Sequence, residues 1–242
     1  MRTDLRGFLH ATGGLRGVVC VAPHPDDESA GCGGLLAGCA ALGVPVSVVV
    51  TTDGAASHRS EAWPPDRLAR RRRAELREAL TVLKVETAPV HLDLPDAAPP
   101  RGPREAEAVS RLAQHLRNRR PGLVVTTWTR EPHCDHQHAS KITRRAARGL
   151  PLTLAQYLVW TPLRGRPDAQ PTRRDGRLID LQLGASMRAA KRGALRCHAS
   201  QRGEVVTDDP DGFALTAAEE AAMTGPTERY VLPRAGLRAE AA

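Results

Sequence analysis

Short apolar runs alternate with amphipathic stretches along the first 150 residues of the chain. Residues 17–22, 44–51, 90–92 and 123–127 are apolar, rich in β-branched side chains and bounded by turn residues. Runs with almost no polar position, such as 44–51, are typical of strands covered on both faces. Residues 29–42, 66–83, 104–119 and 140–148 lie between these runs and have helical patterns. This β-α-β-α order predicts an α/β fold with a mostly parallel sheet and helices on both faces.

The pattern changes after residue 150. We expect strands at residues 156–160, 178–183 and 228–232, the last at an edge of the sheet, and helices at 184–200 and 216–223. The chain has no internal repeat and no clear linker. We therefore predict a single domain over residues 1–242, in which a core at about 17–150 carries the motifs and residues 151–242 complete the pocket.

Residues 29–52 carry no charge, and a stretch of 24 residues is long enough to cross a bilayer. This stretch contains five glycines and Pro45, however, and Gly43 is a natural helix stop. We interpret it as a buried helix followed by a buried strand, and we predict no membrane span.

Composition and charge exclude some classes of protein. The 242 residues are 41% hydrophobic and 26% charged, as in ordinary globular proteins. The net charge of +8 comes from 35 basic residues, of which all but Lys84, Lys141 and Lys191 are arginines spread along the chain. A nucleic-acid interface would cluster them, so we expect no nucleic-acid partner. The five cysteines form no C-x-x-C pair, which favours a reducing, cytoplasmic setting without disulfides.

Acidic residues and histidines follow the predicted strands. His24, Asp26 and Asp27 come after the first strand, in the sequence HPDDE, and residues 133–138, HCDHQH, come after the fourth. The carboxyl ends of parallel strands meet at one edge of a sheet, where ligands bind. Taken separately, these segments could also be an acidic helix cap and a surface loop. Together they predict a metal site, because a cation relieves the repulsion of crowded carboxylates. His24, Asp27 and His136 would be a typical zinc set that leaves one position open.

Four segments resemble a known family. The stretch VVCVAPHPDDESAGCGG resembles the A-H-P-D-D-E signature of the PIG-L (LmbE-like) zinc-dependent deacetylases, and HCDH at 133–136 resembles their H-x-D-H motif. RRAEL at 72–76 is similar to the R-x-x-E helix of the family, and KRGALRCHASQ at 191–201 to its K-x-x-A-L-x-x-[HY]-x-S-Q segment. The resemblance covers about residues 17–201 and implies a Rossmann-like fold.

The resemblance also implies a reaction and its residues. It implies one Zn²⁺ per chain, held by His24, Asp27 and His136, although such a site accepts other divalent transition metals. Asp26 would be the general base for water that attacks an acetamide. His133 would stabilise the oxyanion as an imidazolium, with Asp135 orienting it.

The implied substrate is a small amino-sugar conjugate of the N-acetylglucosamine type, giving acetate and a free amine. Arg72 and Asp96 are candidate substrate contacts, and the alternative for Arg72 is an arginine that only reaches solvent. Two other functions stay open: an amidase for a different amide, and a non-catalytic sugar-binding or regulatory protein. The sequence is also compatible with a homo-oligomer.

Three positions remain open from the sequence. His138 is either an additional ligand or a residue that faces away from the site. Tyr157 and Trp160 are either core residues or a platform for a sugar. We assign no catalytic role to Cys134, where related proteins often have proline.

Overall fold

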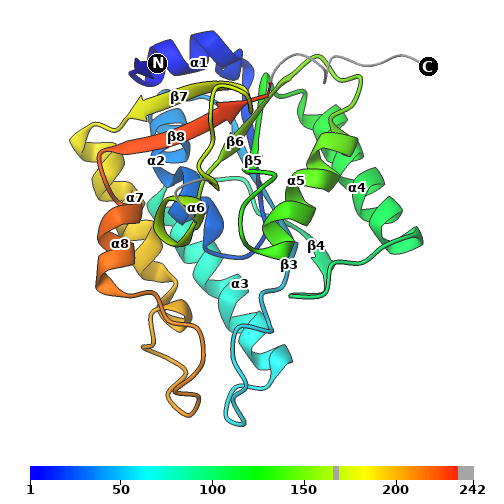
Figure 1. Ribbon diagram of the computed structural model, residues 1–242, viewed down its shortest axis with the longest axis vertical. Coiled ribbons are helices and arrows are strands. Elements are labelled where there is room, and N and C mark those ends of the chain that lie inside the picture. The colour runs from blue at the N-terminus through cyan, green and yellow to red at the C-terminus, as the bar shows by residue number, and fades with distance from the viewer. Residues whose placement is uncertain (166–168, 234–242) are drawn as a thin grey trace.

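The computed structural model of the chain contains a central sheet with helices packed against both faces (Figure 1). It describes residues 1–165 and 169–233, and the parts of the predicted domain at 166–168 and 234–242 lie outside the described residues. Within the described residues, eight strands form one sheet in the order β1-β7-β8-β6-β5-β2-β3-β4. The neighbouring pairs are parallel, except that β8 is antiparallel to β6 and β7. The strands are β1 (Arg2–Thr3), β2 (Val18–Ala22), β3 (Val46–Thr52), β4 (Val90–Leu94), β5 (Leu123–Thr127), β6 (Thr153–Tyr157), β7 (Arg177–Gln182) and β8 (Thr227–Leu232).

The predicted α/β class and mostly parallel sheet are confirmed, but two strand predictions are wrong in detail. The strand expected at 156–160 is β6, which ends at Tyr157, so Trp160 lies beyond it. The strand expected at the edge is β8, which lies inside the sheet between β6 and β7. Six residue pairs join β8 to β7, and β1 adds outside β7. Strand β8 therefore pairs with a neighbouring strand on each side and has no free edge.

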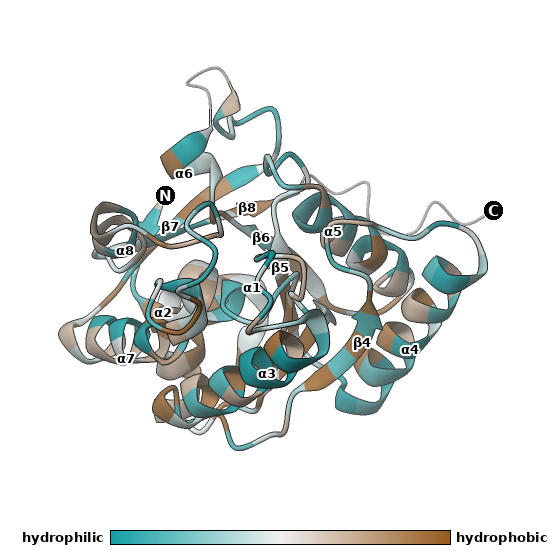
Figure 2. Cartoon of the chain, turned by 90° about the horizontal axis from the view of Figure 1, so that it is seen from below, coloured by the Kyte–Doolittle hydropathy of each residue, from teal (hydrophilic) through white to brown (hydrophobic). Residues whose placement is uncertain are grey.

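The helices divide between the two faces of the sheet. Helices α2, α3 and α7 pack on one face, and α4 and α5 pack on the other, as the end-on view in Figure 2 shows. The helices are α1 (Leu5–Thr12), α2 (Asp27–Ala41), α3 (Pro65–Val82), α4 (Pro103–Arg119), α5 (Cys134–Ala146), α6 (Thr161–Arg164), α7 (Ala185–Cys197) and α8 (Ala217–Met223), and a 3₁₀ turn, η3, spans Ala199–Gln201.

Alternation along the strands builds a core on each face. On β2, Val18, Cys20 and Ala22 pack into the cluster that contains α2 and α7, whereas Val19 and Val21 pack into the cluster that contains α4 and α5. Every residue of β2 is therefore buried, which explains why its sequence has no polar position. The uncharged stretch at 29–52 likewise contributes most of α2 and all of β3 to the interior. In the part of the chain that the structure describes, no helix has both the length and the apolar character needed to cross a membrane.

Helix α5 begins six residues earlier than the predicted helix at 140–148. His133 is its N-cap, and its Nδ1 accepts a hydrogen bond of 3.2 Å from the backbone N–H of Asp135. A histidine cap is unusual, since Ser, Thr, Asp and Asn are the preferred residues at this position. The H-x-D-H motif therefore lies in the first turn of a helix rather than in a loop.

Candidate metal centre

The candidate site lies at the point of the sheet where the order of successive strands reverses. The chain runs from β2 outward to β3 and β4 and then returns to β5 on the other side of β2. The carboxyl ends of β2 and β5 thus flank a topological switch point, the usual ligand site of open α/β sheets. His24 follows β2, and His133 and His136 follow β5, so the structure brings the two predicted clusters together. Their imidazole centroids lie 5.0–5.5 Å apart.

Three buried side chains form the centre of the site. Asp27 Oδ2 lies 3.0 Å from His24 Nδ1 and 3.3 Å from His136 Nε2. One ligand atom from each of the three residues lies within 4.8 Å of the other two. Burial alone lowers the pKa of His136, but the carboxylates of Asp27 and Glu131 together outweigh burial and raise it to about 9. Asp27 thus interacts electrostatically with both histidines.

This donor set fits a transition metal. Two imidazoles and one carboxylate are ligands that zinc accepts, with one coordination position left for water or substrate. His136 supports this assignment, because its Nε2 is buried and makes no hydrogen bond although it lies 3.3 Å from Asp27 Oδ2. A buried nitrogen without a hydrogen bond is costly unless it has another partner, such as a metal ion.

Asp26 lies beside this centre in a strained backbone conformation. Its φ of 145° is one that residues other than glycine rarely adopt, and such strain persists where the surroundings fix the conformation. Its N–H donates to Glu28 Oε2 (2.9 Å), and its Oδ2 accepts from Arg72 Nη2 (3.0 Å). Burial raises the pKa of Asp26 to about 6, although the Arg72 guanidinium acts in the opposite direction.

Arg72 is buried on α3 and holds the loops of the site. In addition to Asp26, it donates to the carbonyls of Gly54 (2.7 Å) and Pro25 (3.0 Å). It therefore does not extend into solvent, which was the alternative considered from the sequence. Its Nε is buried without a hydrogen-bond partner among the described residues, and its side chain lines the cavity next to the site.

The carboxylate of Asp135 lies closer to His24 than to His133. Its Oδ2 is 3.2 Å from His24 Nε2 and 3.8 Å from His133 Nδ1, and it accepts from the Ala97 N–H at 2.8 Å. His133 lies at the cavity with its side chain 40% exposed. Partial burial, together with His24 and His136, lowers the pKa of His133. Since its Nδ1 accepts from a backbone N–H, the proton of the neutral ring lies on Nε2.

Asp96 also contacts the centre. Its Oδ1 lies 3.1 Å from His24 Nε2, and its Oδ2 accepts from the Ala56 N–H at 2.8 Å. Burial alone would raise the pKa of Asp96, but the His24 contact outweighs burial and lowers it. Asp96 thus lies both in the cavity wall and within reach of a candidate ligand.

Glu131 is a residue of the site that the sequence did not predict. It is fully buried and accepts hydrogen bonds from the N–H groups of Val159 (3.2 Å), Trp160 (2.8 Å) and Thr161 (3.1 Å). Its Oε2 also lies 3.4 Å from His136 Nδ1. The only signal in the sequence was its position two residues before His133.

The segment at 191–201, which resembles a motif of the family, supports the site from behind. His198 Nε2 lies 3.1 Å from Glu28 Oε1, and Glu28 in turn binds the Asp26 N–H. Ser200 donates to Glu75 through its N–H (2.9 Å) and its hydroxyl (2.6 Å). The motif thus ties α7 and η3 to α2 and α3.

The structure gives the positions of the residues for which the sequence left two interpretations. His138 faces α4, with its Nε2 3.3 Å from Glu105 Oε2, and so lies away from the centre. Tyr157 is fully buried in the core, whereas Trp160 is half-buried and lines the cavity. Cys134 is exposed at the start of α5.

Comparison with known proteins identifies the family. A model of the PIG-L family, described as GlcNAc-PI de-N-acetylase, matches residues 19–147. The chain therefore belongs to the PIG-L family, as the motifs predicted.

Two relatives with known names are deacetylases. The 1D-myo-inositol 2-acetamido-2-deoxy-alpha-D-glucopyranoside deacetylase of Nocardia farcinica is 31% identical over 93% of this chain and 91% of that protein. The diacetylchitobiose deacetylase of Thermococcus kodakarensis is 31% identical over 52% of this chain, and this match spans only 46% of that relative's length.

Solved structures share the fold. The N,N'-diacetylchitobiose deacetylase of Pyrococcus horikoshii superposes with a TM-score of 0.63 and 23% identity over 82% of this chain and 74% of that one. The 4-carboxy-2-hydroxymuconate hydratase GalB of Pseudomonas putida gives a TM-score of 0.66 and 19% identity over 94% of this chain and 100% of that one. Because a hydratase has the same fold, the fold does not by itself fix the reaction.

Proposed function

We propose that this chain is a zinc-dependent N-deacetylase that hydrolyses the acetamide of an N-acetylglucosamine-type sugar conjugate, giving acetate and a free amine. The observation that carries the proposal is the meeting of His24, Asp27 and His136 in one buried centre, with the Asp26 carboxylate beside it at the cavity. Membership of the PIG-L family and the names of both relatives support the same reaction.

In this proposal His24, Asp27 and His136 hold the zinc ion. When bound, zinc supplies a Lewis acid that polarises the acetamide carbonyl and makes water easier to deprotonate.

Asp26 takes the proton from the attacking water. Among the described residues, Arg72 is the hydrogen-bond donor to the Asp26 carboxylate, and it binds Oδ2. Oδ1 is therefore available to accept the proton. The water oxygen forms a bond to the carbonyl carbon, and the carbonyl oxygen becomes negative. As the carbonyl re-forms, the C–N bond breaks and Asp26 returns the proton to the nitrogen, which gives the free amine and acetic acid, and the acid then ionises to acetate.

His133 donates a hydrogen bond to the developing oxyanion. Its Nδ1 is used by the Asp135 N–H, and its Nε2–H remains for the substrate. We therefore assign His133 as a neutral donor rather than the imidazolium expected from the sequence. We assign Asp135 to the support of His24, which it approaches more closely than His133.

Arg72 and Asp96 stay proposed substrate contacts, because both line the cavity. Their hydrogen bonds within the protein give each a second task. Arg72 fixes the direction of the Asp26 carboxylate, and Asp96 braces His24.

We also infer a reducing, cytoplasmic location. All five cysteines are free thiols, although Cys20 and Cys32 approach within 3.4 Å of each other.

The test combines metal analysis with acetate release. We expect about one equivalent of zinc in the purified protein and acetate release from N-acetylglucosamine conjugates. His136→Ala should lose both metal and activity. Asp26→Ala should keep the metal and lose about 10²–10⁴-fold in rate, the usual contribution of a general base.

His138→Gln is the matched control, since it changes a buried histidine two positions beyond the proposed ligand. It should keep metal and activity. Metal binding without acetate release from any amino-sugar conjugate, but with hydrolysis of another amide, would assign the site to a different amidase. Metal binding without hydrolysis of any amide would favour the binding or regulatory alternative.

A further inference from the structure

The cavity next to the candidate metal centre is small. Its volume is about 310 Å³, at the lower end of the roughly 300–1,000 Å³ typical of small-molecule sites. An amino-sugar ring with its acetamide at the metal centre would use most of this space. The group attached to that sugar must then extend out of the cavity along the half-buried part of its wall.

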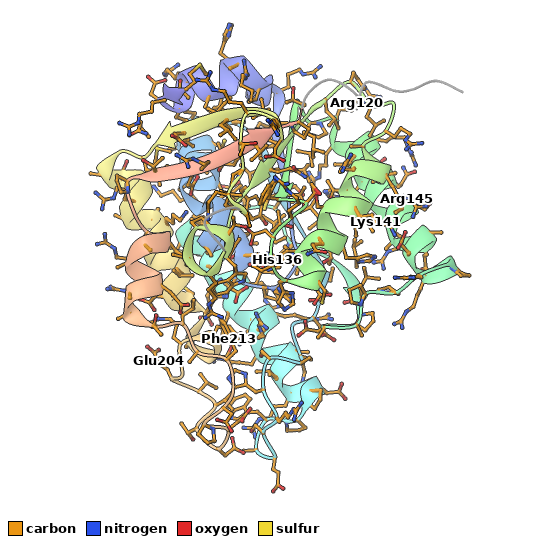
Figure 3. The ribbon with its side chains drawn as sticks, in the orientation of Figure 1. Arg120, His136, Lys141, Arg145, Glu204 and Phe213 are labelled. Atoms are coloured by element: carbon orange, nitrogen blue, oxygen red, sulfur yellow. The ribbon has the colours of Figure 1, made fainter. Side chains whose placement is uncertain are left out.

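An aromatic pair forms part of this wall. Trp160, just before α6, and Phe213, in the segment before α8, meet edge to face with centroids 5.7 Å apart and planes at 82°. Both side chains are half-buried, unlike the fully buried His136, which Figure 3 shows above Phe213. An aromatic face at the edge of a polar cavity offers apolar contact area that the catalytic residues do not.

The cation beside this pair is already neutralised. The guanidinium of Arg164 stacks over the Trp160 ring at 4.3 Å and is paired with Glu219 at 2.6 Å. A site for phosphate would instead present unpaired arginine or lysine donors. This part of the wall is therefore apolar and close to neutral.

Hydrogen bonds of the backbone fix the chain at both aromatic residues. The Trp160 N–H donates to Glu131 (2.8 Å), and the Phe213 N–H donates to the Ser57 carbonyl (3.1 Å). A platform that is rigid before binding loses less entropy when a ligand packs on it.

We propose that Trp160 and Phe213 form a subsite for the group attached to the amino sugar, and that this group is uncharged with a flat apolar face. An aromatic ring and the C–H face of a second pyranose both offer that chemistry. The proposal rests on the proposed function for the identity of the sugar, but the platform itself can be tested by binding alone.

The first test measures kcat/KM for acetate release from four N-acetylglucosamine derivatives, with both anomers of each glycoside. They are the methyl glycoside, the phenyl glycoside, N,N'-diacetylchitobiose and the 1-phosphate. We expect the phenyl glycoside or the disaccharide to exceed the methyl glycoside by about three- to tenfold. Trp160→Leu and Phe213→Leu should each reduce this preference, because they lower kcat/KM for the larger glycosides more than for the methyl glycoside.

Trp63→Leu is the matched control. Trp63 is also half-buried under an arginine, with Arg67 stacked at 4.1 Å, but it does not line the cavity. It should leave the preference unchanged. A wild-type enzyme that does not distinguish the four compounds, or that prefers the 1-phosphate, would overturn the proposal.

A second measurement separates the subsite from the reaction. Calorimetry of the wild type and Trp160→Leu with phenyl and methyl glucosaminides tests the platform without turnover. Weaker binding of the phenyl compound by Trp160→Leu, with methyl binding unchanged, supports the subsite even if no acetate is released. Equal losses for both compounds, or none for either, would refute it whatever the activity.

Discussion

At the scale of single residues, Glu131 shows how the candidate metal centre is supported from behind its candidate ligands. It is a buried carboxylate whose oxygens accept three backbone N–H groups, and it faces Nδ1 of His136 at 3.4 Å. Burial alone would raise the pKa of Glu131, but His136 and these N–H donors outweigh it and lower it. A charged Glu131 therefore favours a proton on His136 Nδ1, which leaves Nε2 free to bind a metal.

This arrangement predicts that Glu131→Gln weakens metal binding by about 10–100-fold, the usual effect of losing a carboxylate behind a histidine ligand. Competition with a chelator of known affinity measures it directly. Glu105→Gln is the control, because Glu105 contacts His138, a histidine of the same helix outside the centre. Equal metal affinity in Glu131→Gln and wild type would show that Glu131 serves only the backbone of residues 159–161.

The meeting of the three candidate ligands was predictable from the sequence and the place of Glu131 was not, for a physical reason. His24 and Asp27 lie in the segment after β2 and His136 in the segment after β5, and parallel strands bring their carboxyl ends together. The partners of Glu131 are backbone groups beyond β6 that carry no side-chain signal. The role of Asp135 likewise depends on His24, 111 residues away in the sequence, and that of Glu28 on His198, 170 residues away.

At the scale of elements, a charged cluster joins α4 to α5 on the face opposite α2. Glu105, on α4, is 4% exposed and accepts from Lys141 at 2.8 Å, with Arg145 and His138 also in contact. The hydrogen bond from Lys141 is the main reason that the pKa of Glu105 is lowered. The cluster therefore ties α4 to the part of α5 beyond the candidate ligand His136.

The lowered pKa of Glu105 gives a signed prediction for stability. A carboxylate whose pKa is lower in the folded state stabilises the protein above its unfolded pKa, near 4.5, and loses this contribution as pH falls through the folded value. Glu105→Gln should therefore lower the free energy of unfolding by about 1–3 kcal/mol at pH 7. The difference from wild type should shrink below about pH 4.5. Urea titrations at pH 7, 5 and 3.5 measure it, and a difference that stays constant over this range would contradict the prediction.

Elements were predicted best where the pattern is long and apolar. Helices α3 and α4 begin within a residue of their predicted starts, where Pro65 and Pro103 stand at the first helical turn. The start of α5 was missed because its cap is a histidine, and α1 and β1 were missed because each is short. These failures reflect local sequences with weak signals, which tertiary packing overrides.

At the scale of the whole molecule, the last strand fastens the C-terminal part to the first helix of the site. Glu228 on β8 accepts from the N–H groups of Gly34 (2.8 Å) and Leu35 (3.0 Å) on α2 and from Lys191 on α7 (2.7 Å). Lys191 and Glu228 are both almost fully buried. The motif lysine at 191 thus acts on the fold, and the position of β8 inside the sheet makes the two predicted parts of the chain interdependent.

The buried Lys191–Glu228 pair predicts that the chain unfolds as one cooperative unit and loses stability when one of the two charges is removed. Lys191→Met should lower the free energy of unfolding by about 3–5 kcal/mol, since it leaves a buried carboxylate unpaired. Lys191→Met with Glu228→Gln should recover part of this loss. Arg229→Met is the control on the same strand, because Arg229 pairs with Asp180 at the surface and should cost at most about 1 kcal/mol.

Urea unfolding followed by both tryptophan fluorescence and circular dichroism provides the measurement. Trp63, Trp128 and Trp160 report on residues 63–160, whereas circular dichroism reports on all helices and strands. Coincident transitions in every variant indicate a single domain, because β8 cannot leave the sheet without separating β6 from β7. If the two signals separate in Lys191→Met, the chain does not unfold in one cooperative transition, and the single-domain prediction fails.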